Sequence, residues 1–274
     1  MRHGNVIGFR SRLLSFLLAS FALISGAATS QVLGTTYSDL WWNPSESGWG
    51  VTVNHQQDVM FLTFFVYRAD TSPYWVTATL GRVGFSTLAH PPHVFTGDLY
   101  ETKGPMFSGA FNPSLVTNRK VGTATFTGTL INAATLQYSI DGASVTKSLE
   151  RQTLRLIDFS GIYLGGTDYL LSNCTIASNN NQEVADTGLM TISQSGTSLR
   201  ITAQGASSTC TFFGTYGQTG SIGSTTGSFS CSDGTNGTFA LDGMQWTLFG
   251  MSTRLSGRSQ FCNFLGILGG IGVH

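Results

Sequence analysis

Alternation with a period of two residues is the feature that most constrains this chain. Short stretches rich in Thr, Val, Phe and Tyr recur from residue 36 onward, separated by Gly, Asn and Ser, and no apolar stripe of period 3.6 is found. In residues 120–130, Ala124, Phe126 and Leu130 share one face and four threonines share the other. A strand of this kind has one dry face and one wet face. The pattern predicts an all-β protein made of antiparallel strands.

The first half contains eight such stretches, joined by short turns. They span residues 36–42, 48–55, 59–68, 73–81, 94–101, 120–130, 134–141 and 143–152. Eight sequential antiparallel strands with one apolar face can close on themselves and so remove their exposed edges. We expect an eight-stranded up-and-down, calycin-like barrel over residues 31–156, with a two-sheet sandwich as the alternative. Because FLTFFV (61–66) is apolar on both faces, its outer face is also expected to be covered.

The second half, residues 157–274, repeats the pattern in what we expect to be a smaller β barrel or sandwich. Strands are predicted from 158–166 onward, at 189–194, 197–203, 209–217, 224–231, 236–242, 245–255 and 260–268. A weak echo links the two halves, because YSDLW (37–41) resembles FSGIY (159–163). Duplication would explain this match, and so would convergent strand composition.

All four cysteines lie in the second half. A hairpin turn centred on Gly220-Ser221 places Cys210 opposite Cys231, at a separation that suits a disulfide. Cys174 and Cys262 would then tie the start of the unit to its last strand. Four cysteines allow three pairings, and this is the one we predict. Zinc is the competing interpretation, but the sequence has no C-x-x-C pair.

Residues 1–30 have the layout of a signal peptide. Arg2, Arg10 and Arg12 precede an apolar run at 13–28 that ends in small residues. This run is shorter than the roughly 20 residues that a membrane-spanning helix needs. We therefore expect a processed, exported protein without a transmembrane span, periplasmic or extracellular, in a compartment where disulfides form.

Composition and the absence of motifs count against several classes of function. The net charge is zero and only 10% of the residues are charged, so a nucleic-acid partner is disfavoured. No nucleophile elbow, zinc-protease helix, P-loop or dinucleotide fingerprint occurs. His90-Pro-Pro-His93 lacks a third metal ligand. We predict no cofactor and no metal, and the sequence favours a non-catalytic protein.

The stretch LWWNPSESGWG (40–50) holds three of the five tryptophans around a turn. Adjacent side chains on a strand point to opposite faces, so one of Trp41 and Trp42 should fill the interior while the other lies outside. Exposed aromatic rings here would form a binding site at the barrel mouth. Its predicted members are Trp41, Trp42, Glu46, Trp49, Tyr74 and Trp75. The alternative is an aromatic cluster that only closes the barrel.

LWWNPSESGWG, together with GPMF (104–107) and VGTATF (121–126), resembles a group of uncharacterised secreted bacterial proteins with an LWWNP-x-E-x-GWG signature. The resemblance covers about residues 36–155. It implies export and β architecture, and it carries no catalytic or ligand residue. The second half resembles small cysteine-containing β domains.

Three functions follow from these observations. The leading hypothesis is an exported, non-catalytic binding protein that presents an aromatic barrel mouth to a small apolar ligand or a glycan. The second is a structural or cell-surface interaction protein that uses a strand edge or the apolar tail 263–274. The third is a hydrolase that uses Glu46 with Asp39 or His55. The sequence leaves the oligomeric state open.

Overall fold

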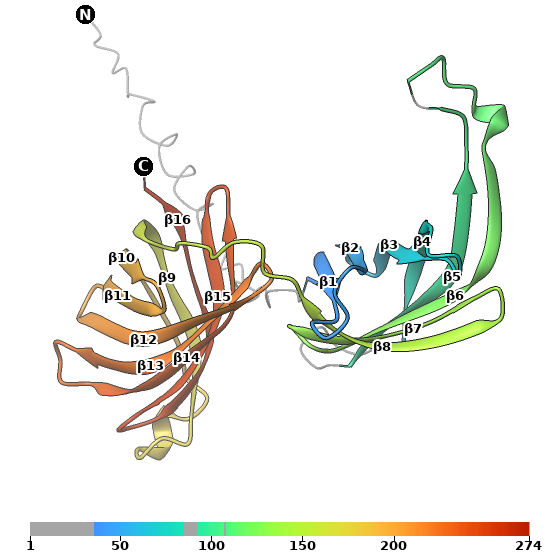
Figure 1. Ribbon diagram of the computed structural model, residues 1–274. Helices are drawn as coiled ribbons and strands as arrows, with labels where there is room; N and C mark the ends of the chain where they lie inside the picture. The colour runs from blue at the N-terminus through green and yellow to red at the C-terminus, as the bar shows by residue number, and fades with distance from the viewer. Residues whose placement is uncertain (1–35, 85–91, 107, 274) are drawn as a thin grey trace, which may run out of the picture. The chain divides into compact units, whose positions relative to one another are not determined.

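The computed structural model describes residues 36–84, 92–106 and 108–273. The predicted signal segment, 1–30, lies outside the described residues. The chain divides into Met1–Gln31 and a compact unit, Val32–His274, which contains every described strand. These strands form two closed antiparallel barrels that follow one another in sequence (Figure 1).

The first barrel has the predicted eight strands in up-and-down order. They are β1 (Asp39–Trp42), β2 (Gly50–Gln56), β3 (Val59–Tyr67), β4 (Pro73–Val83), β5 (His93–Lys103), β6 (Thr117–Leu130), β7 (Ala133–Ile140) and β8 (Ala143–Arg151), with a short 3-10 helix, η1 (Pro113–Leu115), before β6. Each strand pairs with the next, and β8 pairs back with β1. This closure decides between the two predicted architectures in favour of the barrel.

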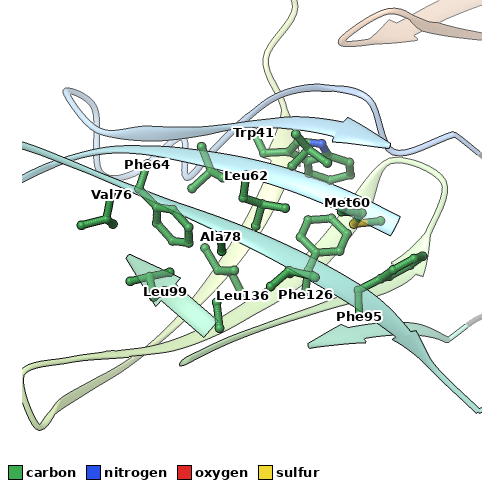
Figure 2. Close-up of a cluster of buried hydrophobic side chains, with 14 of the residues drawn as sticks. Trp41, Met60, Leu62, Phe64, Val76, Ala78, Phe95, Leu99, Phe126 and Leu136 are labelled. Carbon is green, nitrogen blue, oxygen red and sulfur yellow. The ribbon is translucent and has the colours of Figure 1, made fainter. Parts of the chain in front are cut away.

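Alternation builds the core of the first barrel. On β3, Met60, Leu62 and Phe64 point inward and are fully buried, and the intervening residues face outward. Figure 2 shows these three side chains with Trp41 and Phe126 in one apolar cluster. Burial of this kind stabilises a fold by about 1.5 to 3 kcal/mol for each large side chain. The barrel interior is therefore filled by the chain's own residues.

The second barrel also has eight strands. They are β9 (Gly161–Ser172), β10 (Glu183–Ser195), β11 (Ser198–Gln204), β12 (Thr209–Thr219), β13 (Ile222–Cys231), β14 (Asn236–Thr247), β15 (Gly250–Ser259) and β16 (Asn263–Gly272), with η2 (Ala177–Asn179) between β9 and β10. β9 pairs with both β10 and β16, which closes the barrel. β9 and β10 are longer than predicted, because glycines interrupt the apolar alternation there. A Cβ atom at Gly166 would lie 2.0 Å from the carbonyl oxygen of Asp186, so glycine permits this close pairing.

Both predicted disulfides are confirmed. Cys210 and Cys231 are direct partners on β12 and β13, with their Cα atoms 3.9 Å apart. Cys174, just after β9, is joined to Cys262, just before β16. The β12–β13 turn is centred on residues 220–221 as predicted, and Gly220 adopts a φ of +61°, which favours glycine.

The segments YSDLW and FSGIY have the same role in their barrels. In the first, Trp41 Nε1 donates a 2.9 Å hydrogen bond to the carbonyl oxygen of Tyr37. In the second, the Tyr163 hydroxyl donates a 2.9 Å bond to the carbonyl oxygen of Phe159. All four side chains are buried. The same hydrogen bond, from a buried aromatic side chain to the carbonyl oxygen four residues earlier, thus occurs at the start of both barrels. This shared feature supports duplication over chance similarity of composition.

Candidate functional site

The six predicted site residues do not form one cluster at the barrel mouth. Trp41 and Tyr74 point into the first barrel and are buried. Glu46 and Trp49 belong to the β1–β2 loop, residues 43–49. Trp42 and Trp75 lie on the outer face, to which the alternation of β1 and β4 assigns them. The six residues therefore have three different structural roles.

Trp41 is a core residue. Its side chain is 0% exposed, and its ring centroid lies 5.4 Å from that of Phe126 in an edge-to-face arrangement. The guanidinium carbon of Arg151 lies 4.7 Å from the centre of the indole ring. Figure 2 shows Trp41 within the apolar cluster of buried side chains. Trp41 therefore fills the interior, as predicted for one member of the Trp41–Trp42 pair.

Glu46 anchors the β1–β2 loop across the end of the barrel. Lys147, an inward-facing residue of β8, donates to both carboxylate oxygens at 2.8 and 2.7 Å, and Trp49 Nε1 donates to one of them at 3.0 Å. The bond from Lys147 lowers the pKa of Glu46 below its usual value. A carboxylate kept ionised in this way is unsuited to act as a general acid at neutral pH. These contacts indicate that Glu46 holds the β1–β2 loop against β8.

Tyr74 lies beside a buried carboxylate that the sequence analysis did not single out. The guanidinium of Arg68 stacks 3.8 Å from the centre of the Tyr74 ring and donates a 2.7 Å bond to Glu101. Arg119 donates to the other carboxylate oxygen of Glu101 at 2.8 Å and also binds Asp141. Glu101 is only 6% exposed, and these arginines lower its pKa to about 2. The burial of Glu101 could have been predicted from the sequence, because alternation places Glu101 on the same inward face of β5 as Leu99.

The other end of the first barrel contains the histidines. The Tyr37 hydroxyl and His93 Nδ1 are 2.8 Å apart, and burial raises the pKa of Tyr37 to about 12. His55 is half-buried and its ring centroid lies 5.2 Å from that of Phe95, because position 55 faces inward on β2. Burial lowers the pKa of His55. His90 lies outside the described residues, and within them no group of three or more His, Cys, Asp or Glu could hold a metal ion.

The residues proposed for hydrolysis belong to separate networks. Asp39 binds Arg151 at 3.1 Å, whereas Glu46 binds Lys147 at 2.7 Å. His55 hydrogen-bonds the carbonyl oxygen of Gln57 at 2.8 Å. Each group is already engaged by a structural partner, so the contacts give the hydrolase hypothesis no catalytic constellation.

The outer face of β2, β3 and β4 exposes several aromatic side chains of the first barrel. Phe65 is directly opposite Trp75 on β4, and Phe61 is opposite Thr79. Phe65 is 51% exposed and Trp75 is 52% exposed. The expectation that this face is covered is wrong for the described residues. The apolar character on both sides of β3 has two causes, the core on the inside and this exposed surface on the outside.

Neutral polar residues surround these rings. Thr52, Thr63 and Thr77 form one cross-strand row that ends at Tyr100 on β5, and Asn54 lies opposite Phe61. The outward positions of β2, β3 and β4 contain no charged side chain. They are Gly50, Thr52, Asn54, Gln56, Val59, Phe61, Thr63, Phe65, Tyr67, Pro73, Trp75, Thr77, Thr79, Gly81 and Val83. We call this surface the aromatic wall.

Trp42 lies next to this wall on β1. It is partly exposed, it is opposite Glu150 of β8, and its Nε1 is buried with no hydrogen-bond partner in the described part of the chain. Trp75 was among the predicted site residues whereas Phe61 and Phe65 were not, although residues 61–66, which are apolar on both faces, include them.

No protein-family model matches the chain, and no curated protein matches it. Among the described residues, no helix has the length and apolarity needed to cross a membrane.

Proposed function

We propose that this is an exported, non-catalytic binding protein whose first barrel holds a neutral glycan chain against the aromatic wall. The observation that carries the proposal is the exposure of Phe61, Phe65 and Trp75 on a face without charged side chains. Exposed aromatic patches on a protein surface mark interaction sites. This assigns binding to the wall of the barrel instead of its mouth.

The chemistry of the wall matches a sugar better than the alternatives. One face of a pyranose ring presents C–H groups, which pack on aromatic rings, while its hydroxyls bond to neutral polar side chains. Threonines 52, 63 and 77 supply such groups beside Phe65 and Trp75. Anionic glycans and nucleic acids need cations that this face lacks.

A small apolar ligand fits the first barrel less well. Such ligands occupy interior cavities lined by apolar side chains. In this barrel the interior positions of β3 and β4 hold Met60, Leu62, Phe64, Val76 and Leu80, all 0% exposed. We therefore favour the glycan among the two ligand classes.

The test is binding of the purified chain Val32–His274 to soluble neutral polysaccharides. Affinity electrophoresis in gels containing a glucan, a mannan or a xylan would find the ligand, and calorimetry would give its affinity. We expect Trp75→Ala and Phe65→Ala each to weaken binding by about tenfold or more, since central aromatic rings dominate binding energy. Salt should have little effect on a charge-free contact.

Trp246→Ala is the matched control. Trp246 lies on β14 of the second barrel and is 52% exposed, the same fraction as Trp75. Its removal should leave binding unchanged, and all variants should retain the far-ultraviolet circular dichroism of the parent. Failure of every neutral polysaccharide to retard the protein, or equal losses for Trp75→Ala and Trp246→Ala, would refute the proposal.

A further inference from the structure

The second barrel has an exposed aliphatic strip along its last strand. β16 lies between β15 and β9 (Figure 1). On its outer face, Ile271 is opposite Leu164 of β9 and Leu265 is opposite Leu170. Ile271 and Leu164 are 66% and 62% exposed. Exposed aliphatic residues on directly opposed positions form a contiguous apolar surface, which marks an interaction site.

Two unpaired charges flank this strip at its middle. Ile267 of β16 is opposite Arg254 on one side and Asp168 on the other, and all three point outward. Within the described residues, neither Arg254 nor Asp168 forms an ion pair or a side-chain hydrogen bond. Opposite charges placed symmetrically about an apolar strand are self-complementary, because a two-fold rotation about that strand exchanges their positions.

We propose that this face binds a second copy of the chain, with the two-fold axis along β16. Arg254 then faces Asp168 of the partner subunit, and its own Asp168 faces the partner's Arg254. Ile267 and Ile271 pack near the axis. Gly166 and Gly269, which are paired between the two isoleucine rows, leave room for the partner's side chains to approach.

The size of the face suits a weak dimer interface. Three neighbouring strands of the closed barrel, β15, β16 and β9, present a convex strip roughly 14 Å wide and roughly 30 Å long, from their usual spacing and rise. Two such strips bury on the order of 850 Å² in total, which is the size of a weak, transient interface. Glycan binding by the aromatic wall uses the other barrel, so either proposal can fail without the other.

Charge reversal gives a test that separates dimerisation from misfolding. We would measure the mass of Val32–His274 by sedimentation velocity over a wide range of protein concentration. The parent should sediment at twice the mass of the chain. D168R alone and R254D alone should each sediment at the mass of one chain, because each brings like charges together twice. An equimolar mixture of the two variants should recover the double mass, since both contacts then pair opposite charges.

An apolar variant provides the second measurement. L164D should abolish the dimer, whereas L130D should not, because Leu130 is 63% exposed but lies on β6 of the first barrel. A monomeric parent at every concentration would overturn the proposal. So would a dimer that persists in D168R and R254D, or a mixture that stays monomeric.

Discussion

The two barrels have the same strand number and the same connectivity, but different interactions hold them. All seven ion pairs of the described residues lie in the first barrel, which has no cysteine. Both disulfides lie in the second, where no ion pair is found among the described residues. One topology is thus compatible with two different means of stabilisation, one sensitive to acid and the other to reductant.

The segments that lead into the barrels show the difference most clearly. In the first, the fully buried Arg151 donates Nε to the carbonyl oxygen of Ile131 at 2.8 Å, and it also bonds the carbonyl oxygens of Thr36 and Ser38. Asp39 neutralises its charge at 3.1 Å. A buried cation therefore satisfies the backbone carbonyls that precede β1.

In the second barrel, two neutral glutamine side chains satisfy the backbone groups that precede β9. Gln194 accepts from the Phe159 amide and donates to the Ile157 carbonyl, both at 3.0 Å. Gln218 accepts from the Ile157 amide at 2.7 Å. The residue opposite Tyr163 on β16, in the place of Arg151, is Gly272. Amides satisfy backbone groups without the desolvation cost of a buried charge.

Removal of the Cys174–Cys262 disulfide is expected to lower the stability of its barrel more than any other change proposed here. Cys174 and Cys262 are 88 residues apart, and the loss of loop closure entropy predicts a destabilisation of the second barrel by about 4 to 5 kcal/mol in C174S/C262S. The Cys210–Cys231 link, with a separation of 21, should contribute about 3 kcal/mol. Hydrogen exchange followed by mass spectrometry in increasing urea would report each barrel separately. Equal losses of protection in both barrels would mean that they unfold as one, and the comparison would fail.

Arg151→Met should destabilise the first barrel by about 3 kcal/mol or more. The substitution keeps most of the buried volume but leaves Asp39 without its ion-pair partner and three carbonyl oxygens without the arginine donor. Tryptophan fluorescence during urea unfolding is a suitable probe, because four of the five tryptophans precede residue 76. The control Arg200→Met removes an exposed arginine from β11 and should leave the midpoint unchanged. An unchanged midpoint for Arg151→Met would show that the buried ion pair is dispensable.

Alternation and turn chemistry were sufficient to predict the architecture. Inward residues such as Leu62 and Leu136 repeat at every second position, and the pairing of Cys210 with Cys231 follows from the turn at residues 220–221 alone. Local patterns of this kind depend on neighbours a few residues away or on one hairpin register. They therefore remain readable in a single sequence.

The polar networks and the binding surface could not be predicted in the same way. Arg151 bonds a carbonyl 115 residues earlier in the chain, and Glu101 meets Arg68 across 33 residues. These contacts depend on barrel closure, which brings distant strands together. Alternation also shows that Phe65 and Trp75 face outward, but it does not show whether anything covers them. For this reason the six residues predicted to form one site at the barrel mouth lie in three different places: the core of the barrel, the β1–β2 loop and the aromatic wall.

Acid should lower the stability of the first barrel more than that of the second. This effect should be smaller than those of the substitutions above and should develop gradually as the pH falls. The pKa of Glu101 is lowered to about 2 in the folded protein by hydrogen bonds from Arg68 and Arg119, and its usual value is 4.5. Its contribution to stability is therefore fully present above about pH 4.5 and is lost as the pH falls toward about 2. Glu46 and Asp141, whose pKa values are also lowered, act in the same direction. The urea midpoint of the first barrel should fall through this range.

Glu101→Gln tests the origin of that dependence. The variant should have a lower midpoint near neutral pH and a flatter profile toward acid, because the amide keeps the volume but cannot lose a charge. Glu150→Gln, at an exposed position of β8, should follow the parent. In the second barrel, hydrogen bonds from Ser160 and Thr235 lower the pKa values of Asp158 and Asp233, but neither carboxylate is paired with a cation among the described residues, so the midpoint of this barrel should change less over the same range. A second barrel that loses stability as steeply as the first would show that shared topology, and not the different sets of interactions, governs how each barrel responds to acid.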